Sequence, residues 1–381
     1  MSAKLNMRQQ EDKPMILLIG SLPPPYIGPT IAMKILLKSI NINEIFKIEL
    51  FDISDNRNPD NIGKLDIRNI YLAVFHIIKF NIFLMFNRPI IVYIGISQGL
   101  WGYLRDLGFL IPSVLLKKKV IIHLRGSEFL DFYKRMNFIA KYITKYIFKR
   151  ASKVVVLSDK LKFNFSELVR SENIVTIPNG VNFYEYDMSS GISFKKEFKI
   201  RNILFLSSLK KRKGIHIFLK ALPDIFKKYN EINVVIAGGW KNIGDREQAM
   251  EIIRKNEMED KIIFLGEIQG IEKIKTYQNS DLFVFPPVEP EGMPWVLLEA
   301  MSARLPVITT AQGAISDVVE DGVTGYLVDP IPEEISKKIC YFVDNPLIAR
   351  QMGENGRKRV EEKFSRERYL SLMEDLFSSN L

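Results

Sequence analysis

Cysteine and histidine are scarce in this chain. Its 381 residues include one cysteine, Cys340, and three histidines. A single cysteine excludes a disulfide framework and a cysteine-rich zinc site, and it suits a reducing compartment. Three histidines are too few for a multi-histidine centre, and the paired arrangement Asp-x-Asp, a common ligand set for divalent cations, does not occur. The composition therefore predicts no bound metal and no cofactor.

Neither a secretory signal nor a membrane-spanning helix is expected. Residues 1–14 are mostly polar and lead directly into the apolar run 15–20, which does not resemble the apolar core of a signal peptide. The longest apolar stretch, residues 70–96, falls short of the roughly 20 uninterrupted apolar residues that cross a bilayer. The residues that interrupt it are His76, Lys79, Asn81, Asn87, Arg88 and Pro89. We expect a cytoplasmic protein that is soluble or attached to a membrane from one side.

Positive charge is confined to the first half of the chain. Residues 1–180 carry a net charge of +12, and residues 181–381 carry a net charge of −2. This asymmetry indicates an anionic partner for the first half: a phosphorylated acceptor, an anionic membrane surface or nucleic acid. Nucleic acid is not expected, because no RNA-recognition, KH, helix-turn-helix or zinc-finger pattern is present. The fingerprint G-x-G-x-x-G is missing after the first expected strand, which disfavours a nicotinamide-dependent dehydrogenase.

Short apolar runs alternate with longer helical patterns, as in parallel α/β sheets. The irregular segment Val181 to Lys199 is interpreted as a linker between two doubly wound domains, residues 1–190 and 191–381, and the last helix is expected to pack back on the first domain. Ligands bind at the carboxyl ends of such strands, so a cleft between two sheet edges is the natural active site. The expected strands are residues 15–20, 45–51, 90–95, 120–124, 153–158 and 173–178, then 202–208, 232–239, 261–266, 281–287 and 305–310.

The most informative segment is residues 280–330. After a buried strand, a loop carries Glu291 and a helix opens around residues 292–295. Free amides and the positive end of the helix dipole suit a phosphate or pyrophosphate there, and Pro294 suits the first turn, where a missing N–H costs little. Glu299 lies roughly 8 Å further along the helix, where it can accept hydrogen bonds from a ribose diol. The alternative is that Glu299 caps a helix or forms a surface salt bridge.

The run EGMPWVLLEAM at 291–301, followed by LPVITT and DGVTGYLV, resembles the donor-site signature of retaining glycosyltransferases of family 4, within group 1. Further segments resemble parts of that family in the same order along residues 15–365. The resemblance implies an α/β fold of the GT-B class, in which two Rossmann-like doubly wound domains face each other across a cleft. These segments are PPPYIGPT at 23–30, VVVLS at 154–158, IPNGVN at 177–182, SSLKKRKG at 207–214 and VVIAGG at 234–239.

The resemblance implies donor-binding roles in the second domain. Glu291 is implied to face the donor sugar as a catalytic residue, and Glu299 to bind the nucleotide ribose. Lys213 is implied to bind the diphosphate and to stabilise its growing charge. The family's usual arginine is replaced by Ser208, so we expect Arg212 to supply the second charge. Further donor contacts are expected from Gly292, Met293, Pro294, Trp295 and Val296, where Pro294 replaces a frequent glycine and removes one amide, and from Gly239, Gly266 and Ile268 near the base.

Acceptor-side candidates lie in the first domain. Gly28 follows the first strand in a loop that permits close backbone approach before a helix that begins near Thr30; an ordinary βα turn is the alternative. His123 and Arg125 follow another strand, and we favour Arg125 as the catalytic residue of the cleft, because a lone strand histidine is more often part of the core. Glu128 is a further candidate for acceptor contact.

Residues 132–153 carry seven basic residues and no acidic one. A basic amphipathic helix with aromatics is typical of a membrane-surface element, although a helix packed on its own sheet with solvated lysines has the same pattern. The aromatic-rich residues 71–86 are expected either to dip into the membrane interface or to cover the sheet.

The sequence therefore predicts a retaining, metal-independent glycosyltransferase. Its donor is a UDP- or GDP-linked sugar, and its acceptor is a saccharide, expected to be lipid-linked and used in cell-surface polysaccharide synthesis at the inner face of the membrane. The alternatives are a nucleotide-sugar epimerase on the same fold and a non-catalytic protein that binds an anionic surface. The donor sugar and base, the linkage and the oligomeric state stay open.

Overall fold

The computed structural model describes residues 13–54, 67–187 and 198–381. The chain forms two compact units: unit 1 comprises the residues up to Pro178 together with Tyr369–Leu381, and unit 2 comprises Asn179–Arg368. The expected boundary lies twelve residues later, at 190. The difference arises because Val181 pairs with the backbone of Phe364 and Arg366, which attaches the start of the expected linker to unit 2. Residues 188–197 of that linker lie outside the described residues.

Unit 1 is built on a six-stranded parallel sheet in the order β2-β1-β3-β4-β5-β6. The strands lie close to the expected positions. The runs of β-branched and leucine residues in β1, β3, β4 and β5 are buried on both faces, whereas β2 is only partly buried. Their bounds are β1 Met15–Gly20, β2 Lys47–Asp52, β3 Ile91–Ile96, β4 Lys119–Leu124, β5 Lys153–Val156 and β6 Ile174–Thr176.

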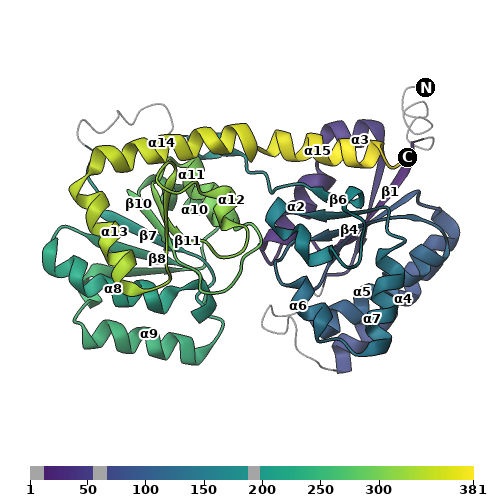
Figure 1. Ribbon diagram of the computed structural model, residues 1–381, viewed down its shortest axis with the longest axis horizontal. Helices are drawn as coiled ribbons and strands as arrows, with labels where there is room; N and C mark the ends of the chain where they lie inside the picture. The colour runs from purple at the N-terminus through teal and green to yellow at the C-terminus, as the bar shows by residue number, and fades with distance from the viewer. Residues whose placement is uncertain (1–12, 55–66, 188–197) are drawn as a thin grey trace. The chain divides into compact units, whose positions relative to one another are not determined.

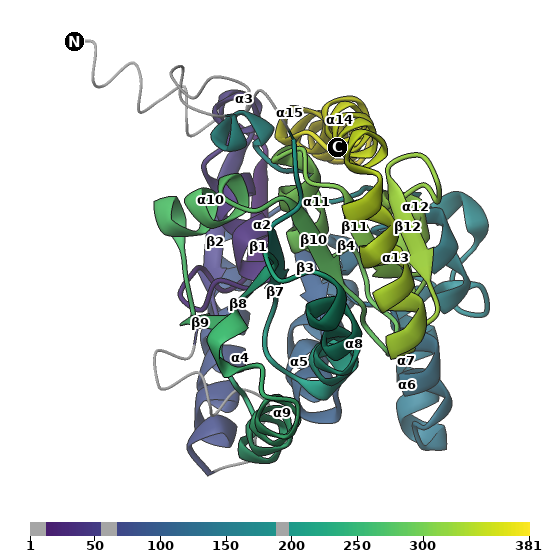
Figure 2. The same ribbon diagram turned by 90° about the vertical axis from the view of Figure 1, so that its left-hand side faces the viewer.

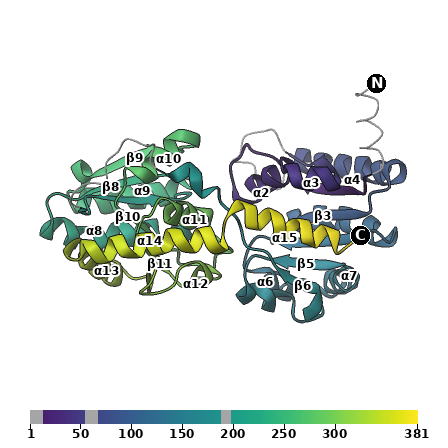
Figure 3. The same cartoon turned by 90° about the horizontal axis from the view of Figure 1, so that it is seen from above.

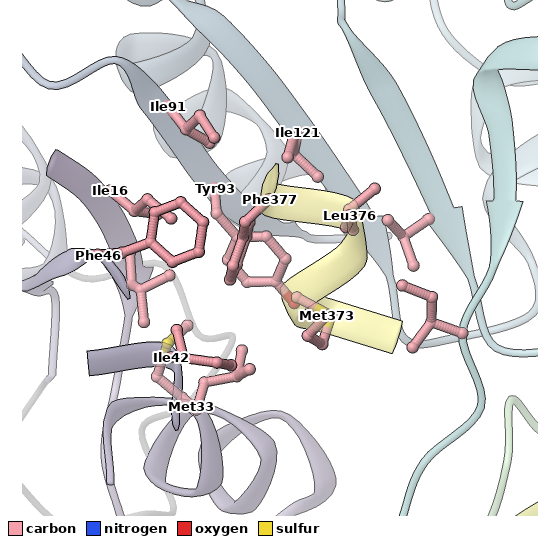
Figure 4. Packing of buried hydrophobic residues seen from close by; sticks show 14 of the residues in the cluster. Ile16, Met33, Ile42, Phe46, Ile91, Tyr93, Ile121, Met373, Leu376 and Phe377 are labelled. Carbon is pink, nitrogen blue, oxygen red and sulfur yellow. The ribbon is translucent and has the colours of Figure 1, made fainter. Parts of the chain in front are cut away.

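Helices cover both faces of this sheet. Figure 1 shows α3 and α15 on one face and α4, α5 and α7 on the other. On the first face, Phe377 of α15 packs edge-on against Phe46 and Tyr93, in a core that α2 and α3 complete (Figure 4). The helices are α2 Gly28–Leu37, α3 Ile40–Ile45, α4 Ile67–Asn87, α5 Leu100–Leu115, α6 Phe129–Lys134, α7 Phe138–Phe148 and α15 Arg366–Ser378.

Unit 2 contains a second six-stranded parallel sheet, in the order β12-β11-β10-β7-β8-β9. Its strands are β7 Asn202–Leu206, β8 Asn233–Ala237, β9 Ile262–Gly266, β10 Leu282–Phe285, β11 Val307–Thr310 and β12 Gly325–Val328. α13 packs beside α8 (Figure 2), and α14 packs along α11 (Figure 3). The helices are α8 Ile215–Lys228, α9 Ile243–Lys255, α10 Gly270–Gln278, α11 Trp295–Ser302, α12 Ile315–Val318, α13 Pro332–Asp344 and α14 Pro346–Lys363.

Local details differ from the sequence expectations. The helix expected near Thr30 begins at Gly28, and the Thr30 hydroxyl donates to the carbonyl of Pro25 instead of starting the helix. The basic stretch 132–153 is two helices rather than one, because Asn137 caps α7 by accepting a hydrogen bond from the Ala140 amide. Strand β12 was not expected from the sequence.

The expectation about membrane-spanning length was wrong for α4. Within the described residues, the segment Ile70–Asn87 forms a helix that is long and apolar enough to cross a membrane by length and composition. His76, Lys79 and Asn81 interrupt the run without breaking the helix, which ends at Asn87 before Arg88 and Pro89. One side of α4 nevertheless packs on the sheet, where Phe80 lies edge-on against Phe51 and Phe109.

Candidate active site

The loop between β10 and α11 is pressed against the loop that follows β7. Gly214 has a φ of 84°, and a Cβ there would stand 1.8 Å from the carbonyl oxygen of Pro286. Only glycine allows this close approach. Because β7 and β10 are neighbours in the sheet, the residues just before Gly214 reach the acidic loop that follows β10.

A charge cluster results from this approach. The Lys213 Nζ lies 2.6 Å from Glu291 Oε1, and the two side chains are 20% and 10% exposed. Arg212 lies 3.8 Å from the same carboxylate and 3.5 Å from Glu289. Two cations and two carboxylates therefore meet at the carboxyl edge of the unit 2 sheet. A buried carboxylate requires such partners, because its desolvation is costly otherwise.

The backbone of Glu291 is held from the other side by the loop after β11. The Ala314 amide donates to the Glu291 carbonyl at 3.0 Å. Gly313 has a φ of 64°, and a Cβ at this position would lie 2.0 Å from the Glu291 carbonyl oxygen. Glu291, in the loop after β10, is thus held in position by contacts from the loops that follow β7 and β11.

Helix α11 begins directly beside this cluster. Pro294 is its N-cap and not its first residue, and no side chain caps the helix. The side chain of Asn179 donates to the carbonyl of Met293 at 2.9 Å and so fixes the turn. The first amides of a helix have no partner within it, so the N–H groups of Trp295 and Val296 are the donors that this turn can present to an anion. Gly292 and Met293 are buried.

Glu299 lies one turn further along α11, where it is buried and both of its carboxylate oxygens have partners. Its Oε1 lies 2.6 Å from Lys273 Nζ, and its Oε2 accepts a hydrogen bond from the Tyr277 hydroxyl at 2.9 Å. Burial, and then the charge of Glu299, raises the pKa of Tyr277 well above its usual range, so this hydroxyl stays a donor. The surface-salt-bridge alternative for Glu299 is therefore wrong, because the side chain is only 8% exposed.

Lys273 and Tyr277 were missed by sequence reasoning. They lie four residues apart on α10, a spacing that places both side chains on one helix face. That spacing is the one local signal that could have indicated a pair. Their partner, Glu299, lies on a different helix, so the contact itself depends on tertiary packing.

The loop after β7 has more cations around it than Lys213 and Arg212, the two that the sequence analysis identified. Lys241 follows β8 and pairs with Glu267 at 2.8 Å. Burial lowers the pKa of Lys210, and the charges of three neighbouring cations lower it further: Arg212, Lys213 and Lys241. A group of like charges held together in this way is typical of an anion-binding site, because a bound anion relieves their repulsion.

The remaining donor-side candidates line the carboxyl ends of β7, β8 and β9. Ser208 lies in the loop after β7, and its carbonyl accepts from the Lys210 amide at 2.9 Å. Gly239 lies beside the Glu267 side chain, whose carboxylate would be 2.1 Å from a Cβ at this position. Gly266 has a φ of 71° and Ile268 is buried. All the donor-side residues predicted from the sequence are therefore gathered at one edge of one sheet.

Unit 1 has its own polar group at the ends of β3 and β4. Arg125 donates to the hydroxyls of Tyr93 at 3.0 Å and Tyr369 at 3.1 Å. His123 is fully buried, with its Nδ1 2.6 Å from the Tyr93 hydroxyl. Burial, and then the charge of Arg125, lowers the pKa of His123 well below its usual range, so the ring is neutral near pH 7. These contacts make His123 part of the core and hold Arg125 in place.

The other two acceptor-side candidates begin helices at the same sheet edge. Gly28 is the first residue of α2, and Glu128 precedes α6, where its amide donates to the Gln98 side chain at 2.6 Å.

Among the residues that the structure describes, no three His, Cys, Asp or Glu side chains gather into a group that could hold a metal ion.

Comparisons with known proteins match this architecture. Residues 192–359 match a family model described as glycosyl transferases group 1. An uncharacterized glycosyltransferase, MJ1069, of Methanocaldococcus jannaschii is 28% identical over 269 residues, which are 68% of this chain and 68% of that protein. The capsular polysaccharide biosynthesis glycosyltransferase CapM of Staphylococcus aureus is 25% identical over 257 residues, 63% of this chain and 66% of CapM.

Solved structures resemble the chain over nearly its whole length. Sucrose-phosphate synthase from Thermosynechococcus elongatus superposes with a TM-score of 0.77 at 17% identity, covering 96% of this chain and 99% of that one. Anabaena Alr3699/HepE, solved in complex with UDP and glucose, gives a TM-score of 0.72 at 17% identity, covering 96% and 100%. At such identities the likeness concerns the fold.

Proposed function

We propose that this chain is a retaining, family 4 glycosyltransferase of group 1, which transfers a sugar from a nucleotide-diphosphate donor to a saccharide acceptor. The group 1 family model, the glycosyltransferase relatives and the GT-B structural neighbours support this proposal. The α/β fold and the group 1 resemblance predicted from the sequence are confirmed. Polysaccharide synthesis is the setting of the related CapM. The retaining course, the donor and the acceptor are the proposal.

The observation that carries the proposal is the charge cluster beside α11. Lys213 and Arg212 converge on Glu291 within 2.6 to 3.8 Å, next to a helix N-terminus that no side chain caps. A donor diphosphate supplies the negative charge that these cations and the Trp295 and Val296 amides are arranged to bind. Glu291 then faces the sugar. The UDP bound to HepE in its solved structure supports a UDP- or GDP-linked donor here.

Glu299 is proposed to bind the ribose. The residue lies about one helical turn beyond the Trp295 and Val296 amides, and its carboxylate is oriented by Lys273 and Tyr277. Ribose hydroxyls donate hydrogen bonds that a carboxylate accepts, so a ribose diol adds to or replaces the Lys273 contact. The predicted backbone residues Gly239, Gly266 and Ile268 are proposed to line the base.

The proposed reaction is a front-side displacement. The bond between the anomeric carbon and the diphosphate oxygen breaks, and its electron pair leaves with the diphosphate. The acceptor oxygen forms its new bond on the same face of the sugar, and its proton passes to the departing diphosphate. Lys213 and Arg212 stabilise the charge that develops on the leaving group, as preplaced cations do in transition states. We propose that these charges make a divalent metal unnecessary.

The acceptor is proposed to bind unit 1, near Arg125 and Glu128. We further propose that this acceptor is a lipid-linked saccharide and that the enzyme works at the cytoplasmic face of the cell membrane. The net charge of +12 on residues 1–180 supports an anionic surface as the partner of unit 1.

A thermal-shift panel tests the donor proposal. UDP, GDP, ADP and their sugar conjugates are each titrated against the protein. One base series should stabilise it selectively, by about 2.7 kcal/mol at a ligand concentration of 100 Kd. Lys213→Ala and Glu299→Ala should clearly reduce this stabilisation while the fold is retained. Equal stabilisation of both variants and the parent would refute the site.

Product analysis tests the chemistry. Turnover should persist in EDTA, and the product's anomeric configuration, determined by proton NMR, should equal that of the donor. Loss of turnover in EDTA that Mg²⁺ restores would refute metal independence, and an inverted anomer would refute retention. An epimerised nucleotide sugar formed without acceptor would indicate an epimerase instead.

A further inference from the structure

Helix α4 is apolar on both sides, although only one side packs on the sheet. Phe80 and Leu84 are buried at 0% and 2% exposure on the packed side. The opposite side carries apolar residues at helical spacing over an arc of roughly 120°, with no charged residue inside the arc. These residues, the outer face of α4, are 49–79% exposed: Tyr71, Val74, Phe75, Ile78, Ile82, Met85 and Phe86.

Two neighbouring helices extend this outer face. α5 packs against both α4 and α7, so the three helices form one layer on the unit 1 sheet (Figure 1). α5 exposes Leu104 and Leu115 at 45% and 63%. The first turns of α7 expose Phe138, Ile139 and Tyr142 at 82%, 69% and 66%. Exposed apolar surface on this scale is unusual for a monomeric soluble protein and indicates a binding surface.

The charged residues around this layer are mostly positive. Residues 67–153 contain fifteen Lys and Arg but three Asp and Glu. One of the three acids, Asp106, is fully buried and paired with Arg105 at 2.8 Å. Lys79 borders the outer face of α4 itself, and Lys145 on α7 and Lys149 at its C-cap are exposed. An apolar face bordered by cations complements an anionic lipid bilayer, in which acyl chains take the apolar residues and headgroups take the lysines.

We infer that the outer face of α4, together with the exposed residues of α5 and α7, docks unit 1 on an anionic membrane. Because Phe80 and Leu84 anchor α4 to the sheet, the helix lies in the plane of the interface and does not cross the bilayer. The basic helix singled out from the sequence supplies charge, and the apolar contact comes mainly from α4. The inference deepens the proposed function, on which it rests for a lipid-linked acceptor.

The topology of unit 1 places part of this surface at the same sheet edge as the acceptor-side residues. In a parallel α/β sheet, each helix runs back against the strands, so helix N-termini lie at the carboxyl edge of the sheet. Tyr71 near the start of α4 and Phe138 at the start of α7 are therefore at the same edge as Arg125, which follows β4. A membrane that contacts these helix starts presents lipid-linked acceptors at the edge where unit 1 is proposed to bind them.

Vesicle binding tests the inference. The full chain is sedimented with vesicles of phosphatidylglycerol and phosphatidylethanolamine, and with vesicles of phosphatidylcholine alone. The triple variant Phe75→Ser/Ile78→Ser/Ile82→Ser should lower the partition coefficient on anionic vesicles by about tenfold or more, and Lys145→Glu/Lys149→Glu should weaken binding and its salt dependence. The matched control Ile243→Ser/Ile271→Ser/Leu347→Ser replaces three even more exposed apolar residues of unit 2 and should bind as the parent does.

The outcomes separate this inference from the proposed function. Absence of parent binding to anionic vesicles, or equal binding by the α4 variant, overturns it. So does a parent dimer that the α4 variant converts to monomer with vesicle binding unchanged, because the face would then bind a second copy. Donor-induced thermal shifts are measured in all variants: intact shifts with no vesicle binding refute the membrane surface alone, whereas absent shifts with intact vesicle binding refute the donor site alone.

Discussion

Replacement of Lys213 by alanine tests the electrostatic core of the site. The lysine lies 2.6 Å from a Glu291 carboxylate that is 10% exposed. In Lys213→Ala this carboxylate retains Arg212, at 3.8 Å. Breaking a buried pair costs about 3–5 kcal/mol. Because Lys213 is itself one-fifth exposed and Arg212 remains, we expect the free energy of unfolding to fall by about 2 kcal/mol.

The same change should weaken donor binding. A charge-assisted hydrogen bond to a phosphate contributes about 1.5–3 kcal/mol, so the Kd for the nucleoside diphosphate should rise by about 10- to 100-fold. Chemical denaturation measures the first effect, and isothermal titration calorimetry measures the second. Lys358→Ala is the control, because its ion pair with Glu362 is exposed and 3.9 Å long, and it should change neither quantity.

A second substitution separates the two effects. In Lys213→Ala/Glu291→Gln the unpaired carboxylate is gone, so most of the lost stability should return. Donor affinity should stay low, because the cation that binds the diphosphate is still missing. An unchanged Kd in Lys213→Ala would refute the idea that this lysine binds phosphate. Lost stability that the double variant does not recover would refute the pairing argument.

Three further substitutions probe the surroundings. Glu299→Gln should weaken nucleoside diphosphate binding by about tenfold and leave inorganic pyrophosphate unaffected in calorimetry, because only the former has a ribose; equal losses would contradict this role. Gly313→Ala should lower the melting temperature more than Gly322→Ala, since both have a positive φ but only Gly313 faces the Glu291 backbone; equal losses would contradict a clash. Burial raises the pKa of Asp187, but hydrogen bonds and charges from Arg304 and Arg357 outweigh it and hold the pKa below its ordinary value. The contribution of Asp187 to stability is therefore present above its unfolded pKa of about 3.9 and is lost as the pH falls through the lowered value. Asp187→Asn should flatten that acid limb in pH-dependent denaturation.

The sequence by itself was sufficient for much of the fold. Strands such as β1 and β4 are short runs of β-branched and leucine residues between polar turns, and this local pattern reports burial directly. The run from Glu291 to Glu299 was equally informative, since a strand, an acidic loop and a helix start follow one another within a few residues. Strand β12 was missed, and the division of residues 132–153 by Asn137 was not seen.

Tertiary structure decided which of these residues meet. Lys213 and Glu291 are 78 positions apart, and they touch because the sheet order places β7 beside β10. Glu299 finds Lys273 and Tyr277 only through the packing of α11 on α10. The outer face of α4 is the converse case. The helix carries apolar residues on two opposite sides, and only the position of the sheet decides which side is buried and which is left exposed. Periodicity is a local property that the sequence records, whereas pairing across a sheet and the choice of a buried face depend on the whole fold.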